Sequence, residues 1–293
     1  NENSDSIKAL KAALESKEVK DFITEKYNGA VVSTVDNPGD GYDSTVNYDA
    51  LAGTTITVAA SPTPHAEILK IAQEILAKKD VTLKISEFTD YVQPNNVVES
   101  GEIDANFFQH EPYMNDFNEN NGTHLVSVAA VHYEPFGLYA GKTKAIADLA
   151  DGATIAVPND GSNEARALYL LQQEGLITLK ADAGFTATVL DIAENPKNLN
   201  IVEVAAAQLP RSLEDVDMAV INGNYAIQAG LNASTDALAV ESAEGDSAKT
   251  YANILCVKEG NENNEAIKAL AEILTGADVA QYINETFGGA VVP

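Results

Sequence analysis

Short apolar runs alternate with amphipathic segments along residues 54–293. Residues 55–60 form a run of β-branched and aliphatic side chains, which predicts a buried strand. After it, apolar residues recur three and four positions apart from Ile68 to Leu76, which predicts a helix that begins near His65. Strands and helices that alternate in this way indicate an α/β protein with mostly parallel sheets.

The same pattern predicts a second long helix and further strands. The helix covers about residues 164–174 and ends at Gly175, because glycine favours the end of a helix. The predicted strands are 81–85, 105–108, 125–131, 136–140, 154–157, 200–204, 218–222, 237–241 and 254–257.

The order of these elements indicates two lobes. The chain passes between two sets of strands near Tyr139 and again near Leu231. Two such crossings fit a clamshell with a ligand cleft at the ends of the strands. We therefore expect residues 54–140 and 232–293 to form lobe I and residues 141–231 to form lobe II.

The two ends of the chain repeat one another. Residues 1–33 align without gaps to residues 261–293. The Ile-Lys-Ala-Leu sequence at 7–10 recurs at 267–270, and the Gly-Ala-Val-Val sequence at 29–32 recurs at 289–292. Each copy predicts two short helices followed by an extended run. Because the endings match in register, we interpret residues 1–33 as a helical extension that duplicates the C-terminal tail.

Residues 34–53 are rich in Asp, Asn, Gly and Tyr, which predicts a linker. The simplest interpretation is that residues 1–33 are the tail of a preceding, similar domain in a tandem protein. The alternative is one domain that has acquired an extra copy of its own tail. In either case we expect the C-terminal copy to occupy its own site on the body and the first copy to pack on a different surface, either of its own body or of a neighbouring molecule.

Charge and cysteine content exclude several classes of function. The chain has 44 acidic and 18 basic residues, a formal net charge of −26, which disfavours nucleic acids and anionic lipid surfaces as partners. No run of 18 apolar residues predicts a membrane span. The single cysteine, Cys256, lies in an apolar strand-like run, so we expect a buried thiol and no internal disulfide.

Aromatic side chains gather where two predicted strands end. Tyr91 follows one strand end, where it faces a cleft or packs against the next helix. Phe108, His110 and Tyr113 follow another. Ligands of α/β sheets bind at strand ends, and imidazole and phenol groups suit an amphipathic ligand. The histidines of the chain are scattered without the spacing of a metal site, so metal binding is the weaker hypothesis.

Polar side chains gather at two other element boundaries. Asn163 and Arg166 lie one turn apart at the start of a predicted helix, where backbone amides and a guanidinium make a receptor for a carboxylate. The alternative for Ser162 or Asn163 is a helix cap. Asn222 and Asn224 follow a buried strand, either as ligand contacts or as turn formers. No nucleophile elbow, phosphate loop or isolated carboxylate pair indicates an enzyme.

Taken in order, these segments resemble the NlpA family of lipoproteins, the methionine-binding components of ABC importers. The resemblance covers residues 54–293. It rests on the stretches FTDYVQPN, IDANFFQHEPYM, VHYEPFGLYAGK, TIAVPNDGSNEARALYLLQQEGLI, AAQLPRSLEDVDMAVINGNYAIQAGLN and GGAVVP.

The resemblance implies a type II periplasmic-binding-protein-like fold that binds methionine without a cofactor, a metal or catalysis. Tyr91, Phe108, His110 and Tyr113 would enclose the side chain. Asn163 and Arg166 would bind the carboxylate, and Asn222 and Asn224 would orient the polar groups. The further candidates are Tyr133 and Glu134.

The family also implies partners and a location. The partners would be the permease and ATPase of an ABC transporter. An N-terminal lipid anchor upstream of this sequence would hold the protein at the outer face of the cell membrane or in the periplasm. The alternatives are a methionyl dipeptide, another amino acid, or a zinc or manganese ion as the ligand.

Overall fold

The computed structural model divides into two compact units. Unit 1 comprises Asn1–Glu134 and Gly245–Pro293, and unit 2 comprises Pro135–Glu244. The structure describes residues 15–27, 32–33, 39–40, 42, 46–241, 247–262, 264–287 and 290–293. No helix among these residues is both long and apolar enough to cross a membrane.

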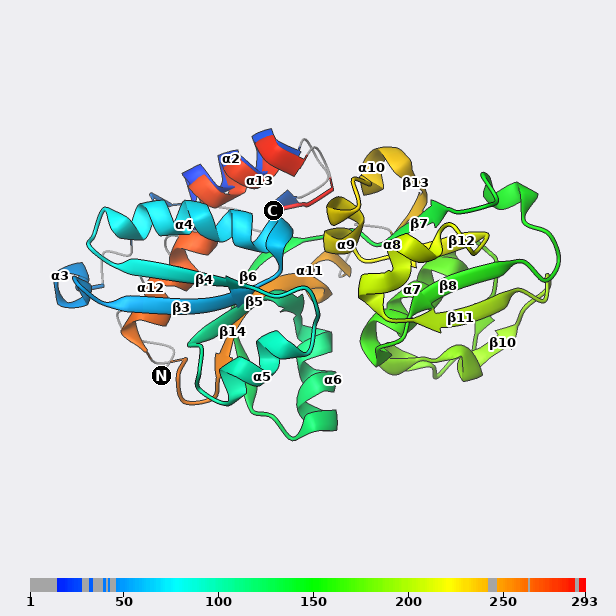
Figure 1. Cartoon of the computed structure of the whole chain (residues 1–293), viewed down its shortest axis with the longest axis horizontal. Coiled ribbons are helices and arrows are strands. Elements are labelled where there is room, and N and C mark those ends of the chain that lie inside the picture. The colour runs from blue at the N-terminus through cyan, green and yellow to red at the C-terminus, as the bar shows by residue number, and fades with distance from the viewer. Residues whose placement is uncertain are drawn as a thin grey trace. The chain divides into compact units, whose positions relative to one another are not determined.

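Unit 1 is built on a six-stranded mixed sheet with helices on both faces (Figure 1). Strand β3 is parallel to its neighbours β4 and β5, whereas β14 is antiparallel to β5 and β6. The strands, in spatial order, are β2 (Val32–Ser33), β6 (Leu125–Tyr133), β14 (Ala252–Lys258), β5 (Ala105–His110), β3 (Thr55–Ala60) and β4 (Thr82–Glu87).

The helices of unit 1 form two groups. One group packs together and consists of α4 (Glu67–Ala77), α12 (Glu265–Leu274) and α13 (Ala277–Phe287). The other group, α5 (Gln93–Glu99) and α6 (Glu111–Asn121), lies on the other face of the sheet (Figure 1). Helix α4 begins after the irregular turn η1 (Pro62–Ala66) and buries Ile68, Leu69 and Leu76, so the predicted apolar spacing is confirmed.

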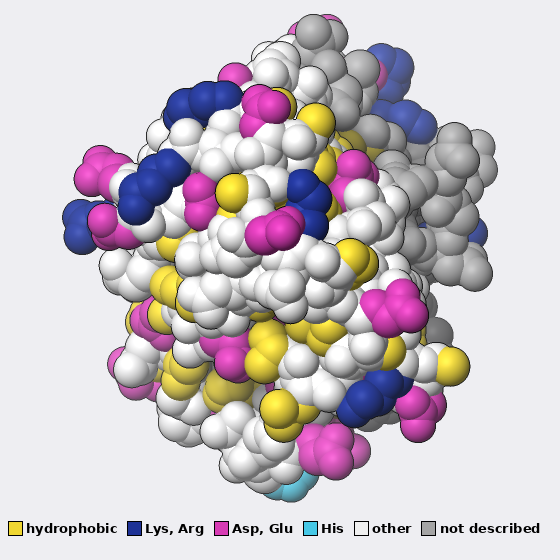
Figure 2. Space-filling model, turned by 90° about the vertical axis from the view of Figure 1, so that its right-hand side faces the viewer, with side chains coloured by type: hydrophobic (Ala, Val, Ile, Leu, Met, Phe, Trp, Pro, Cys, Tyr) yellow, Lys and Arg dark blue, Asp and Glu magenta, His cyan; other side chains and the backbone are white. Residues whose placement is uncertain are grey.

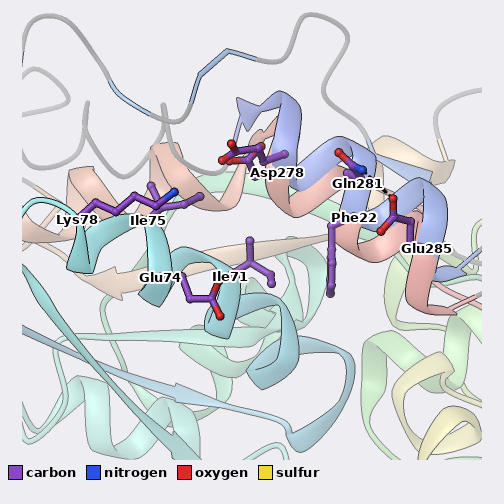
Figure 3. A pocket seen from close by; sticks show the side chains of 9 residues that line it. Phe22, Ile71, Glu74, Ile75, Lys78, Asp278, Gln281 and Glu285 are labelled. Atoms are coloured by element: carbon purple, nitrogen blue, oxygen red, sulfur yellow. Dashed lines mark hydrogen bonds between the residues drawn. The ribbon is translucent and has the colours of Figure 1, made fainter.

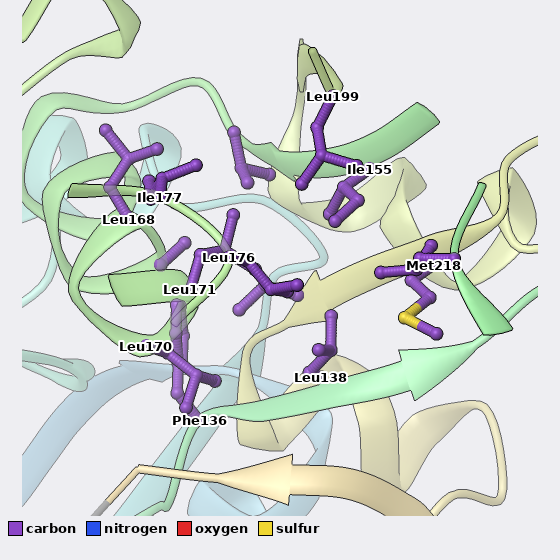
Figure 4. Packing of buried hydrophobic residues seen from close by; sticks show 14 of the residues in the cluster. Phe136, Leu138, Ile155, Leu168, Leu170, Leu171, Leu176, Ile177, Leu199 and Met218 are labelled. Atoms are coloured by element: carbon purple, nitrogen blue, oxygen red, sulfur yellow. The ribbon is translucent and has the colours of Figure 1, made fainter. Parts of the chain in front are cut away.

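Unit 2 has a five-stranded mixed sheet with the order β11-β8-β12-β7-β13. Its core is an apolar cluster between this sheet and helix α7, with Phe136, Leu171 and Met218 among its buried members (Figure 4). The elements are β7 (Gly137–Ala140), β8 (Thr154–Pro158), α7 (Gly161–Gln173), β11 (Asn200–Val204), α8 (Leu209–Ser212), β12 (Met218–Ile221), α9 (Gly223–Gln228), α10 (Ala233–Asp236) and β13 (Ala237–Val240).

Short elements complete the two units. A small sheet in unit 2 pairs β9 (Thr178–Leu179) with β10 (Ile192–Glu194). Unit 1 also contains β1 (Glu15–Ser16), α2 (Lys17–Tyr27), α3 (Tyr48–Leu51) and α11 (Ser247–Thr250).

The surface shown in Figure 2 has acidic and basic side chains interspersed, with no basic patch on that face.

Two features differ from the sequence expectations. Both sheets are mixed rather than mostly parallel, because the chain returns through β7 and β14, each antiparallel to its two neighbours. The units also divide at Glu134/Pro135 and at Glu244/Gly245, which places β7 and β13 in unit 2. The reason is hydrogen bonding: β7 pairs with β12 and with β13, so these strands stay with the sheet of unit 2.

The first copy of the repeat lies where the second copy lies. Helix α2 runs along α13, as the blue and red ribbons in Figure 1 show. Because two helices cannot fill one volume, this placement does not decide where the first copy packs, and the expectation that it packs on a different surface stays a prediction. The first helix predicted for this copy lies outside the described residues.

Candidate functional site

The first candidate cluster surrounds the start of helix α7 in unit 2. Asp160 is the N-cap, and its Oδ1 accepts hydrogen bonds from the backbone N and the Nδ2 of Asn163, at 3.1 and 2.7 Å. Asn222, directly after β12, donates from Nδ2 to the Asn163 Oδ1 at 3.0 Å. The structure thus brings two predicted residues together, and it assigns the cap to Asp160 rather than to Ser162 or Asn163.

Arg166 lies one turn further along α7 and is 5 % exposed. Its Nε donates to Glu241 Oε2 at 2.9 Å, and its Nη2 donates to Glu241 Oε1. The guanidinium also stacks on the Phe136 ring, with its carbon 4.4 Å from the ring centroid. The Phe136 backbone N donates to the same Oε1 at 2.9 Å. Glu241 therefore binds both the Arg166 side chain and the backbone directly before β7. A fork of this kind matches carboxylate geometry and fixes the direction of the guanidinium.

Two buried polar atoms in this cluster have no hydrogen-bond partner among the described residues. They are the Ser162 Oγ and the Asn222 Oδ1, on side chains that are 1 % and 6 % exposed. A buried polar atom without a partner costs about 1–3 kcal/mol, so such atoms are expected where a ligand or a water completes the site. The cluster therefore offers a hydroxyl and an amide oxygen to a ligand or a water, beside a guanidinium that is paired with Glu241.

The second cluster is aromatic and lies in unit 1. Phe108 at the end of β5 and Tyr113 in α6 are buried, with ring centroids 6.0 Å apart. Tyr91 is half-buried, and its ring lies 5.7 Å from each of those two rings. The Tyr113 hydroxyl donates to the Tyr91 backbone oxygen at 3.0 Å, which fixes the loop before α5 against α6.

His110 has a structural task next to this cluster. Its Nδ1 accepts the Tyr113 backbone N–H at 3.2 Å, so His110 is the N-cap of α6. Its ring packs edge-on against Tyr251, 5.2 Å between centroids. Helix N-caps are usually Ser, Thr, Asp or Asn. The imidazole of His110 accepts the same kind of backbone hydrogen bond and also packs as an aromatic ring against its neighbours.

Three titratable side chains that the sequence reasoning left apart meet inside unit 1. The His65 Nε2 lies 3.3 Å from Glu134 Oε1 and 2.9 Å from Asn253 Oδ1, and the His132 Nε2 lies 2.7 Å from the same Glu134 oxygen. Burial lowers the pKa of His65 to about 4 and lowers that of His132 well below its usual value. Two neutral histidines that share one carboxylate are the consequence.

This trio also has the composition of a metal donor set, since its ligand atoms all lie within 4.8 Å of one another. In the structure these atoms bond to one another and to Asn253. Sequence spacing does not reveal the trio, because its histidines come from the η1 turn and from β6 and meet only across the sheet.

The remaining predicted residues flank these groups. Tyr133, at the end of β6, and Glu134 are both buried, at 0 and 5 % exposure. Asn224, in the first turn of α9, is 2 % exposed. In unit 2 the structure brings Asn163, Arg166 and Asn222 to one end of the sheet, and in unit 1 it brings Tyr91, Phe108, His110 and Tyr113 together. Sequence reasoning did not identify Glu241 as a site residue. The feature that could have indicated it is its position directly after the apolar strand β13.

Comparisons with known proteins agree with this organisation. TpN32, a membrane lipoprotein of Treponema pallidum, is 47% identical over 240 residues, which cover 82% of this chain and 88% of TpN32. The methionine-binding lipoprotein MetQ of Bacillus subtilis is 43% identical over 242 residues, covering 81% of this chain and 87% of MetQ. A solved nutrient-binding protein from Burkholderia cenocepacia, bound to methionine, has a TM-score of 0.77 and 44% identity, covering 81% of this chain and 98% of that one.

Two α/β units, each on a mixed sheet and joined by two chain crossings, define the class of two-domain substrate-binding proteins. Within that class, the NlpA lipoprotein family model matches residues 56–293, and the chain belongs to this family. The predicted fold class and family are thereby confirmed.

Proposed function

We propose that this protein is the extracytoplasmic substrate-binding component of an ABC importer and that its ligand is L-methionine or a close relative. The observation that carries the proposal is the likeness to a solved protein that is bound to methionine and is 44% identical over 81% of this chain. As in the lipoproteins it resembles, the natural protein would be held at the membrane by a lipid, and its partners would be the permease and ATPase of the importer.

Each cluster, taken by itself, suits one part of a methionine molecule. A thioether packs well against aromatic ring edges, and Tyr91, Phe108 and Tyr113 present such edges. The carboxylate is assigned to Arg166 and the first turn of α7, where a helix N-terminus favours an anion.

The ammonium group of the ligand needs acceptors. The Asn222 Oδ1 is a buried acceptor without a hydrogen-bond partner among the described residues, and Glu241 adds a negative charge beside Arg166. The proposal assigns the ammonium to these groups, and Asn224 supports the same strand end. Every group assigned here binds or orients a ligand, so the proposal makes the chain a binding protein rather than an enzyme.

Calorimetry on ligand-stripped protein tests this function. We expect L-methionine to bind with one site per chain and to bind more tightly than lysine or glutamate, because the aromatic rings assigned to the side chain suit an uncharged thioether. Binding of lysine or glutamate as tight as that of methionine would contradict the proposal.

The second candidate function is metal capture, which the trio of His65, His132 and Glu134 favours. Repeating the titration with a chelator separates the two functions. The methionine proposal predicts no change with EDTA and no stoichiometric binding of Zn²⁺ or Mn²⁺. Loss of methionine binding in EDTA would make the metal part of the site.

A further inference from the structure

The structure places both copies of the terminal repeat in one site of unit 1, where two helices cannot lie at the same time. Helix α2 spans Lys17–Tyr27 and helix α13 spans Ala277–Phe287, the same bounds 260 residues later. The ring of Phe22 occupies the place of the ring of Tyr282, its counterpart in the repeat. The repeat seen in the sequence is therefore also a repeat of position.

The strand that follows each helix reaches the same partner. Val32 in β2 pairs with Tyr133 of β6, and Val292 also pairs with Tyr133. The Tyr133 backbone N donates to Val292 O at 2.5 Å, and its O accepts from Val292 N at 2.6 Å. Val32 and Val292 are counterparts in the repeat, so both copies end in one register on one edge of the sheet.

Both copies also meet the same groove beside α4. The groove is lined on the body by Ile71, Glu74, Ile75 and Lys78 (Figure 3). Glu18 of the first copy and Asp278 of the second line it from equivalent positions of the repeat. A negative side chain of either copy thus lines the same groove as Lys78.

We propose that the site of α13 on unit 1 accepts either copy of the repeat and that, within one chain, residues 15–33 exchange with residues 275–293. Two helices cannot fill one volume, so the docking of one copy releases the other. The exchange can take place within one chain because the segment between β2 and β3 joins the first copy covalently to the unit that carries the site.

One side-chain difference biases the exchange towards the second copy. The Tyr282 hydroxyl donates to Glu67 of α4 at 3.4 Å, a bond that Phe22 has no hydroxyl to make. We therefore expect the second copy to be docked in most molecules and the first copy in a minority.

Paired cysteines on the full chain report which copy is docked. Lys78→Cys with Asp278→Cys would trap the second copy, and Lys78→Cys with Glu18→Cys would trap the first. Cys256 is fully buried, and burial raises the pKa of its thiol, so it reacts little with a mild oxidant. Glu18→Cys with Glu119→Cys is the control, because α6, which carries the exposed Glu119, lies on the other face of the sheet.

We expect both Lys78→Cys pairs to give an intramolecular cross-link and the control pair to give none. Adding Ile283→Asp, which weakens α13, should raise the yield of the Glu18 pair several-fold, and the matched Ile23→Asp should abolish it. No Glu18 cross-link in a folded Ile283→Asp background would overturn the proposal. A Glu18 cross-link found only between two chains would overturn exchange within one chain.

Discussion

Arg166 has an environment that combines charge, stacking and direction. Glu241 receives two of its N–H groups, and the Phe136 ring supports its flat face. These contacts keep the guanidinium in one orientation in a buried setting, where a hydrogen-bonded charge pair with a ligand is strong. The other arginine, Arg211 in α8, is exposed.

Arg166→Ala should therefore weaken methionine binding at least a hundredfold, about 3 kcal/mol, because the ligand carboxylate loses its main charge partner. Calorimetry measures the loss, and Arg211→Ala is the matched control that should leave affinity unchanged. Since Arg166→Ala leaves Glu241 without this partner, the double variant Arg166→Ala, Glu241→Gln should be tested in parallel. Near-normal affinity in a folded variant would remove Arg166 from the site.

Glu164, two residues before Arg166, has a pKa that burial raises to about 7. Its Oε1 accepts the Val189 backbone N–H at 2.8 Å, a bond that a glutamine oxygen also makes. The folded state holds this proton more tightly than the unfolded state, so stability falls as the pH rises from about 4.5 to about 7.

Glu164→Gln removes the ionisation and should raise the free energy of unfolding by about 1–2 kcal/mol at pH 8, with no difference below pH 4. Denaturant titrations at the two pH values measure this. Glu214→Gln, at an exposed position, controls for the loss of one negative charge. A variant that is less stable than the parent at pH 8 would contradict the assignment.

At the scale of elements, sequence patterns predicted most helices and strands because each buries a stripe or run of apolar residues. The run at 154–157 became β8, and the helix predicted at 164–174 became α7 over Gly161–Gln173. Its early start comes from the Asp160 cap, a local signal that Ser162 and Asn163 obscured. Strand direction was predicted less well, since antiparallel pairing of β7 and β14 depends on partners remote in sequence.

The same limit applies to the site. Residues adjacent in sequence, such as Phe108, His110 and Tyr113, were predicted as a group. Glu241 and the trio of His65, His132 and Glu134 were not, because folding alone brings their elements together. Pattern reasoning therefore predicts the members of a local cluster and misses partners that arrive from other elements.

The aromatic cluster at β5 and α6 should set selectivity. Methionine should bind several-fold more tightly than norleucine, because sulfur gains about 0.3–1.5 kcal/mol per ring contact that a methylene does not. Phe108→Leu should remove most of this preference. Phe117→Leu, in the same buried cluster but not assigned to the ligand, should keep it. Equal affinities for the two amino acids in the parent protein would contradict the role of the cluster.

At the scale of the molecule, the family match at residues 56–293 leaves the first copy outside the region that the relatives share. Its site on unit 1 is also filled by α13, which pairs with Tyr133 through Val292. We therefore expect ligand binding not to depend on the first copy.

Deleting residues 1–45, which keeps the buried Val46 and Leu51, should leave methionine affinity unchanged. Calorimetry of the shortened and full chains gives the comparison. A tenfold or greater loss of affinity in a folded, shortened chain would make the first copy part of the binding machinery.

The central claim is that the protein selects methionine. The most direct measurement is mass spectrometry of the small molecules released on denaturing protein that has been incubated with an equimolar mixture of amino acids and then desalted. The account predicts that methionine is released in near-stoichiometric amount and is strongly enriched over the other amino acids. Enrichment of a different amino acid, or release of none, would contradict it.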